Sequence, residues 1–278
     1  DYPHHLLEWV ILDDSPEQPE NLEFEHADAR GIRVKYIWKA TKMKLGAKRN
    51  LSHKYCEGEI IVYMDDDDYY PPTRVSHAVS SLVQQPYLVA GCSELPLLIV
   101  PERSVWMTHS FGPFHATGNT LAFHRDYLSD HHFEPEATEA EESFFLDQFS
   151  TPMVQLEPLK TITCIGHSRN TVDKRRFITS TQGLDISRVH AKKDQFAPTE
   201  FLDDYCLALA EIERRHRHGI VTHAPVLSAE QSMHGITKAA REHKVAVITP
   251  YYQEDPSILK RCHESVRSQS VACTHFLI

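Results

Sequence analysis

The chain has 278 residues, of which 41% are hydrophobic and 24% are charged, and its formal net charge is −10 at pH 7. This is the composition of an ordinary globular protein, long enough for one large domain or two smaller ones. The negative net charge argues against broad nucleic-acid binding, which requires a basic face. No apolar run approaches the roughly 20 residues of a membrane helix, so we expect neither a nucleic-acid partner nor a transmembrane segment.

Six cysteines are scattered along the chain without a CxxC pair. This pattern favours free thiols in a reducing compartment, so we expect a cytoplasmic protein. The sequence opens with Asp1 rather than Met and without a secretory signal pattern, so we expect a fragment of a longer protein.

The first third of the chain alternates between strand and helix patterns. Residues 6–12 form an apolar run that ends in acids and a proline, which predicts a buried strand followed by a turn. Residues 32–37 alternate like a second strand. Residues 44–56 carry apolar side chains at helical spacing, and Gly58 is a helix stop.

The most unusual stretch is the apolar run 60–64, which leads directly into four acids, Asp65, Asp66, Asp67 and Asp68. Adjacent like charges repel unless a positive group lies among them. The run has the length of a strand, and ligands bind at the carboxyl edge of strands in open α/β sheets. Carboxylate oxygens suit Mg²⁺ or Mn²⁺. A solvated acidic turn is the alternative.

A helix is predicted from Pro71 to about Gln84, which completes a strand-helix-strand-helix order typical of a parallel sheet. The sequence then predicts β structure at 87–100, a loop at 111–120, a strand at 121–123, a helix start at 138–146, and short strands at 154–156 and 161–165.

The last hundred residues differ in character. Residues 200–218 are strongly helical, and a polar helix is predicted near 228–243, so 179–243 is interpreted as a helical linker or accessory region. Residues 244–253 then predict a new buried strand. A helix at 257–269 and the beginning of another strand at 274–278 follow it.

Five motifs in this order resemble those of the family 2 glycosyltransferases with the GT-A fold, over roughly residues 5–175. They are Asp13-Asp14-Ser15, Gly46-Ala47-Lys48-Arg49-Asn50, Met64-Asp65-Asp66-Asp67-Asp68, the acidic pair Glu141-Glu142 with Leu146, and His167 after a late strand. The resemblance implies a GT-A (Rossmann-like) α/β fold in residues 1–178, with a mixed, mainly parallel sheet flanked by helices, and a C-terminal helical extension.

The resemblance also implies an activity. A hexosyltransferase of this kind moves a sugar, with inversion, from a nucleotide-sugar donor, here a UDP-sugar, to the hydroxyl of a glycan, lipid-linked or protein acceptor. Mn²⁺ or Mg²⁺ would act as a Lewis acid on the departing diphosphate. A nucleotidyltransferase and a non-catalytic nucleotide- or sugar-binding module are the alternatives.

The resemblance assigns the metal to Asp67 first, with Asp65 nearer the ribose or the water shell of the metal. His167 is a candidate third ligand, and a loop histidine without a ligand is the alternative. Asp66 is grouped with the nucleotide-binding acids, although it and Asp68 could equally serve as turn or capping residues.

Four further residues are nucleotide-binding candidates by the same resemblance. Asp13 and its neighbour Asp14 would hold uracil or ribose, unless they are simple turn acids. Lys48 and Arg49 would face the nucleotide or balance the acids, and a solvated helix face is the competing interpretation.

Transfer to a hydroxyl needs a base within hydrogen-bond reach of it. Glu142 is the candidate base, with Glu141 as second choice. Adjacent helix residues point about 100° apart, so only one of the two can face a cleft. The alternative is that both acids merely stabilise a helix N-terminus.

One departure from the family pattern concerns its first strand and helix, which would precede residue 1. Residues 244–278 resemble the missing piece. Either they begin a second glycosyltransferase domain, or they fill the vacant place in the first domain, as in a permutation or a swapped dimer. The strand at 274–278 duplicates a position that 8–12 already occupies, which favours the tandem protein. The vacant sheet position would still attract the C-terminal strand.

Overall fold

The computed structural model describes residues 2–16, 18, 31–100, 102–167, 170, 174–175, 178, 186–189, 195–218 and 244–251. A seven-stranded sheet has the order β2-β1-β11-β3-β7-β4-β8. Its strands are β1 (Leu7–Asp13), β2 (Arg33–Trp38), β3 (Ile60–Tyr63), β4 (Val89–Gly91), β7 (Ala122–His124), β8 (Val154–Gln155) and β11 (Val245–Tyr251). The first four strands in this order run parallel, whereas β7 is antiparallel to both of its neighbours.

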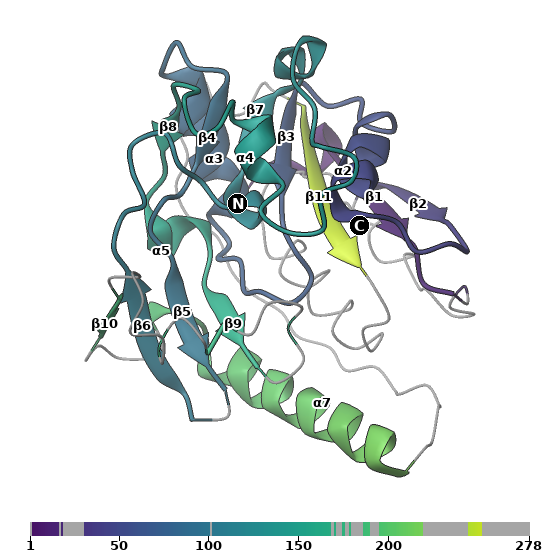
Figure 1. Cartoon of the computed structure of the whole chain (residues 1–278), viewed down its shortest axis with the longest axis vertical. Helices are drawn as coiled ribbons and strands as arrows, with labels where there is room; N and C mark the ends of the chain where they lie inside the picture. The colour runs from purple at the N-terminus through teal and green to yellow at the C-terminus, as the bar shows by residue number, and fades with distance from the viewer. Residues whose placement is uncertain are drawn as a thin grey trace.

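Helices lie on both faces of this sheet (Figure 1). They are α2 (Leu45–His53), α3 (Arg74–Val83), α4 (Glu142–Phe145) and α5 (Pro158–Thr161), with the short 3₁₀ turns η1 (His4–Leu6), η2 (Gly118–Thr120) and η3 (Arg125–Ser129). A mixed, mainly parallel sheet flanked by helices was expected, and it is confirmed.

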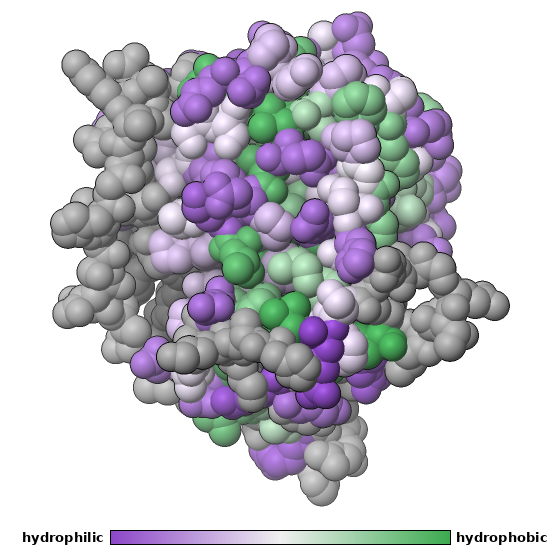
Figure 2. Space-filling view, turned by 90° about the vertical axis from the view of Figure 1, so that its left-hand side faces the viewer, coloured by the Kyte–Doolittle hydropathy of each residue, from purple (hydrophilic) through white to green (hydrophobic). Residues whose placement is uncertain are grey.

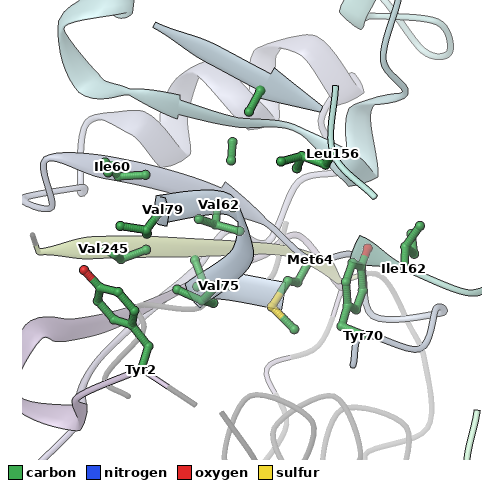
Figure 3. Close-up of a cluster of buried hydrophobic side chains, with 14 of the residues drawn as sticks. Tyr2, Ile60, Val62, Met64, Tyr70, Val75, Val79, Leu156, Ile162 and Val245 are labelled. Atoms are coloured by element: carbon green, nitrogen blue, oxygen red, sulfur yellow. The ribbon is translucent and has the colours of Figure 1, made fainter. Parts of the chain in front are cut away.

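Alternating side chains of the central strands build two cores, because successive strand residues point to opposite faces. Val62 of β3 and Val247 of β11 lie in the core that α3 covers. Ile61 and Ile248 of the same strands lie in the other core, with Phe145 of α4. Figure 3 shows the first core, where Val75 and Val79 of α3 approach Ile60, Val62 and Val245.

A second, four-stranded sheet has the order β10-β6-β5-β9. Its strands are β5 (Pro96–Ile99), β6 (Ser104–Thr108), β9 (Cys164–Gly166) and β10 (Ile186–Arg188). The helix α7 (Thr199–His218) packs Leu202, Tyr205 and Leu209 against this sheet (Figure 1). In the region 179–243, the described segments β10 and α7 therefore pack against the rest of the protein.

The strand β11 lies between β1 and β3, parallel to both. Val247 pairs with Trp9 on one side and with Val62 on the other. Val245, Ala246, Val247 and Ile248 are 0% exposed. This is the vacant sheet position that the C-terminal strand was expected to attract. The other C-terminal predictions lie outside the described residues. They are a helix near 228–243, a helix at 257–269 and a strand at 274–278.

Two local predictions differ from the structure. The helix predicted to begin near 138 is limited to the four residues of α4. Thr161, predicted as part of a strand, ends α5, whose first turn is favoured by Pro158 at the N1 position. The strand predicted at 161–165 therefore begins only at Cys164.

Figure 2 shows the side of the molecule that lies at the left in Figure 1. On the coloured part of this face, hydrophilic residues alternate with small hydrophobic groups, so the visible apolar surface is divided. Among the described helices, none combines the length and apolar character that crossing a membrane requires.

Candidate active site

Three parallel strands bring the sequence motifs to one edge of the large sheet. Asp13 at the end of β1 pairs in register with Tyr251 at the end of β11. Ile248 of β11 pairs with Tyr63, the last residue of β3, which precedes the acidic turn. The carboxyl end of β11 therefore lies between Asp13 and the turn formed by residues 65–68. Ligands of open α/β sheets bind at this edge.

Asp13 is completely buried and has a donor on each carboxylate oxygen. The Ser15 amide donates to Oδ1 at 2.8 Å, and the Tyr36 hydroxyl donates to Oδ2 at 2.6 Å. Burial and this hydrogen bond raise the pKa of Tyr36 far above its usual value. The carboxylate of Asp13 is thus fixed in position, and each oxygen retains a lone pair for a further donor.

Asp14 forms a buried ion pair with Lys48. The Lys48 ammonium donates to Oδ1 at 2.6 Å, and the Met43 amide donates to Oδ2 at 2.7 Å. Burial lowers the pKa of Lys48 to about 8, although the Asp14 carboxylate opposes that shift. The negative charge of Asp66 also favours the ammonium form of Lys48, so Asp66 acts electrostatically on this pair. Lys48 is therefore buried in an ion pair rather than on a solvated helix face, and its role toward a nucleotide stays a prediction.

Two residues of the helix motif fix the packing of α2. The N–H of Gly46 donates to the Ala137 carbonyl, and a Cβ at this position would lie 1.9 Å from the Glu134 carbonyl oxygen, so only glycine allows this approach. Asn50 exchanges two hydrogen bonds with the backbone of Phe133. Both contacts join α2 to the segment that precedes α4.

Arg49 connects the acidic turn with the acidic pair. Its Nε donates to Glu141 Oε1 at 2.7 Å, and its Nη2 lies 3.8 Å from Asp65 Oδ2. The guanidinium also lies over the Tyr63 ring, 4.4 Å from the centroid. A Cβ at Gly118 would approach Glu141 Oε1 to 2.6 Å and Arg49 Nη2 to 2.9 Å, so glycine leaves the space for this pair.

Glu141 and Glu142 differ in their surroundings. Glu141 is buried and forms an ion pair with Arg49, whereas Glu142 is partly exposed. Burial, with a smaller effect of the neighbouring Glu141, raises the pKa of Glu142 to about 7. A carboxylate with this pKa can accept a proton near neutral pH. Of the two acids, Glu142 has the properties expected of a base.

The backbone on both sides of α4 is strained. Ala140 has φ of 51°, and the consecutive residues Asp147, Gln148 and Phe149 have φ of 48°, 56° and 61°. Positive φ is uncommon for residues other than glycine, and such strain clusters at functional sites. The short helix that carries Glu142 is therefore held in place by its packing against the rest of the protein.

The acids of the turn have different partners. Burial, with smaller effects of Asp67 and Asp68, raises the pKa of Asp65 to about 7 in spite of the nearby Arg49. Burial alone would raise the pKa of Asp67 as well, but Lys174 and His167 outweigh it and lower the pKa.

Asn170 joins Asp67 to His167. Its side-chain Nδ2 donates to Asp67 Oδ2 at 2.8 Å and lies 2.9 Å from Nε2 of His167, and its Oδ1 accepts the His167 amide. Asp67 and His167, two of the three predicted metal ligands, are thus brought together, with the Asn170 amide between them. Among the described residues, no group of three His, Cys, Asp or Glu side chains has a metal-binding arrangement.

Asp68 is buried, and three donors satisfy its carboxylate. The Ile165 amide and the Lys174 ammonium donate to Oδ1, at 2.9 Å and 2.6 Å, and the Asn119 amide donates to Oδ2 at 2.7 Å. Burial would lower the pKa of Lys174, but Asp67 and Asp68 outweigh it and raise the pKa strongly. Asp68 therefore joins the turn to β9 and to η2, which precedes β7.

Three residues at this edge were missed by sequence reasoning: Tyr36, Asn170 and Lys174. Asn170 follows His167 closely, but nothing in the local pattern distinguishes it from other loop residues. Lys174 pairs with an acid 106 positions earlier in the chain, so no spacing rule could have found it.

A comparison with protein families matches residues 1–128 to "Glycosyl transferase family 2". The expected resemblance to this family is thereby confirmed for that part of the chain. A curated relative is "Protein CgeD" of Bacillus subtilis (strain 168), 26% identical over 136 residues, which are 46% of this chain and 32% of that protein. The chain thus spans about a third of the length of this relative.

Solved structures of S. aureus TarS are also similar. TarS 1-349 in complex with UDP-GlcNAc gives a TM-score of 0.47 at 17% identity, covering 61% of this chain and 52% of that one. TarS 1-349 in complex with UDP gives 0.45 at 16% identity, covering 78% and 64%.

Proposed function

From the match of residues 1–128 to the family 2 glycosyl transferases, we propose that this protein transfers a sugar from a nucleotide-sugar, specifically a UDP-sugar, to an acceptor hydroxyl. One structural observation carries the proposal furthest. The buried guanidinium of Arg49 contacts Asp65 of the acidic turn and Glu141, the neighbour of Glu142. This link supports the proposal that the sheet edge suited to a donor and the candidate base belong to one site.

The proposed reaction is a direct displacement with Glu142 as base. The acceptor oxygen forms a bond to the anomeric carbon while the bond from that carbon to the diphosphate oxygen breaks. Glu142 takes the proton of the acceptor hydroxyl, and the nucleoside diphosphate leaves with the electron pair. Attack opposite the leaving group inverts the anomeric centre. The pKa of about 7 suits Glu142 to this role at neutral pH.

Binding of the nucleotide is proposed for the edge formed by β1, β11 and β3. The fixed carboxylate of Asp13 would accept hydrogen bonds from the base or ribose. Asp14, Lys48 and Asp66 would support this end of the site through the buried ion pair. Arg49 would act mainly through its contacts with Asp65 and Glu141, rather than by facing the nucleotide.

A divalent cation, Mn²⁺ or Mg²⁺, is part of the proposal. Magnesium is commonly held by one or two carboxylates together with substrate phosphates, and the Asp67 carboxylate at the sheet edge fits that chemistry. Asp65 and His167 are the further candidate ligands. When bound, the cation would neutralise the charge that develops on the departing diphosphate.

The position of β11 weakens the case for a non-catalytic module. That alternative rested on the first strand of the family, which helps to form the nucleotide pocket and is not among the motifs that residues 5–175 match. β11 occupies the corresponding position between β1 and β3. That 244–278 begins a second glycosyltransferase domain stays a separate proposal.

The test is donor turnover with a panel of UDP- and GDP-sugars in the presence of Mn²⁺, measured as released nucleoside diphosphate. We expect slow hydrolysis of at least one UDP-sugar, and a loss of that activity in Glu142→Gln. The matched control is Glu139→Gln, an exposed acid three positions earlier. Release of pyrophosphate from a nucleoside triphosphate and a sugar phosphate would instead indicate a nucleotidyltransferase. No turnover in any of these assays would contradict the proposal.

A further inference from the structure

A lysine from a distant part of the chain, Lys174, forms ion pairs with the acidic turn. The ammonium of Lys174 lies 2.6 Å from Asp68 Oδ1 and 3.5 Å from Asp67 Oδ2. Its side chain is 14% exposed, so most of it is removed from water. Lys174 therefore neutralises part of the charge that a divalent cation at Asp67 would also neutralise.

The turn needs such a counter-charge even without a ligand. Asp67 and Asp68 are consecutive in the chain, and the like charges of their carboxylates repel each other. Asp68 is 4% exposed, and a buried carboxylate is costly unless it is paired and hydrogen-bonded. The Ile165 and Asn119 amides supply neutral donors to it, whereas Lys174 supplies the positive charge.

A divalent cation at Asp67 would meet the ammonium at close range. The Lys174 ammonium lies 3.5 Å from Asp67 Oδ2, so a cation bound by the Asp67 carboxylate and this ammonium would repel each other strongly. Asp67, Asp68 and Lys174 together carry one negative charge. Adding a divalent cation alone would reverse that charge, whereas a cation with a diphosphate would not.

We propose that Lys174 is the resident counter-cation of the acidic turn and that it competes directly with a divalent cation for Asp67. In the protein without nucleotide, Lys174 keeps cation affinity low. A diphosphate restores the balance, because its negative charge can pair with the ammonium that the metal displaces. Metal and donor are therefore expected to bind together rather than in sequence. The inference rests on the proposed function only in that a divalent cation and a diphosphate are the ligands of this edge.

The experiment measures Mn²⁺ binding to the whole chain without nucleotide, from the electron paramagnetic resonance signal of free Mn²⁺. Lys174→Gln removes the charge and keeps an amide that can donate to Asp68. We expect it to bind Mn²⁺ about tenfold or more tightly than the wild type, because a unit positive charge 3.5 Å from Asp67 Oδ2 is removed. Lys174→Arg, which keeps the charge, should stay within about twofold of the wild type.

The matched control is Lys160→Gln, which removes the same charge from an exposed pair with Glu157. It should leave Mn²⁺ affinity unchanged. Equal or weaker Mn²⁺ binding by folded Lys174→Gln would overturn the proposal. If Lys174→Gln unfolds without metal, Mn²⁺ must restore its circular dichroism spectrum, and a failure to do so would also overturn it.

A second titration separates this inference from the proposed function. UDP is added to the wild type in the presence of Mn²⁺ and followed by calorimetry. A wild type that does not bind UDP would contradict the proposed function, while the nucleotide-free Mn²⁺ affinities would still decide the role of Lys174.

Discussion

Arg49 and Glu141 form a buried ion pair, 2.7 Å from Nε to Oε1, although 92 positions separate them in the chain. Their side chains are 2% and 5% exposed. The pair joins α2 to the residue before α4, and the same guanidinium lies near Asp65. Arg49 thus adds a buried electrostatic link between the acidic turn and the segment that carries Glu142.

Replacing Arg49 by Met should strongly destabilise the protein, because Glu141 would be left buried without its cation. Removing one partner of a buried pair costs about 3–5 kcal/mol. Urea unfolding measures the effect. The double variant Arg49→Met/Glu141→Gln should recover part of the loss, since no unpaired charge remains. Arg125→Met, which removes exposed contacts with backbone carbonyls, is the control. A loss no larger than that of the control would show that the pair is not needed for stability.

The rate of sugar transfer should depend on the ionisation of Glu142. Its pKa of about 7 means that the base is protonated, and therefore inactive, at lower pH. We expect kcat/KM to fall about tenfold per pH unit below that value, and Glu142→Gln to lose about 10²–10⁴-fold in kcat while it still binds UDP. The pH profile of Glu139→Gln should match that of the wild type. A rate that stays constant from pH 5 to 8 would remove Glu142 from this role.

Asp65 and Glu142 should each lose a contribution to stability as the pH rises through the same range, whereas the buried His53 and His77, with pKa values lowered to about 3 and about 4, contribute in the opposite direction. The ordinary pKa values of Asp65 and Glu142 are 3.8 and 4.5, and both groups have pKa values of about 7 in the folded protein. Between these limits each of the two carboxyls binds more protons in the folded than in the unfolded state, so its contribution to the free energy of unfolding decreases with pH. Urea midpoints from pH 4 to 8 measure this slope. Glu142→Gln should change this slope in the positive direction relative to the wild type, and an unchanged slope would contradict the raised pKa of Glu142.

The central position of β11 predicts an unequal response to two neighbouring substitutions. Val247→Asp places a charge between β1 and β3 at a position with no exposure, and it should prevent folding. Lys244→Asp, at an exposed position just before the strand, should be tolerated. Circular dichroism and size-exclusion chromatography compare the two variants. Similar behaviour of both would show that β11 does not occupy this position in solution.

The strands and helices near the site could be predicted from the local sequence pattern. The apolar run before Asp65 and the acids after β1 each mark the carboxyl end of a strand, and the parallel order brings those ends to one edge. The short α4 could not be predicted, because its limits depend on packing and on strained backbone at Ala140 and at 147–149 rather than on helix propensity.

The ion-pair and hydrogen-bond partners of the acids in the turn could not be predicted from the sequence either. Asp65 pairs with Arg49. Asn170 donates a hydrogen bond to Asp67, and Lys174 donates one to Asp68. Nothing in a run of four identical residues indicates this division, because each partner comes from a distant element of the fold. The sequence could place the charges at the sheet edge, but it could not say which charge balances which.

The most direct test of a nucleotide site at this edge is calorimetric titration of UDP, in the presence of Mn²⁺, into the wild type and two variants. Asp67→Asn removes the candidate metal ligand, and Asp126→Asn removes an exposed acid elsewhere. We predict saturable binding by the wild type and by Asp126→Asn, and binding at least about tenfold weaker for Asp67→Asn, the size expected for a lost interaction with a metal. Absence of binding by the wild type, or equal affinity in all three proteins, would contradict a metal-assisted nucleotide site at the acidic turn.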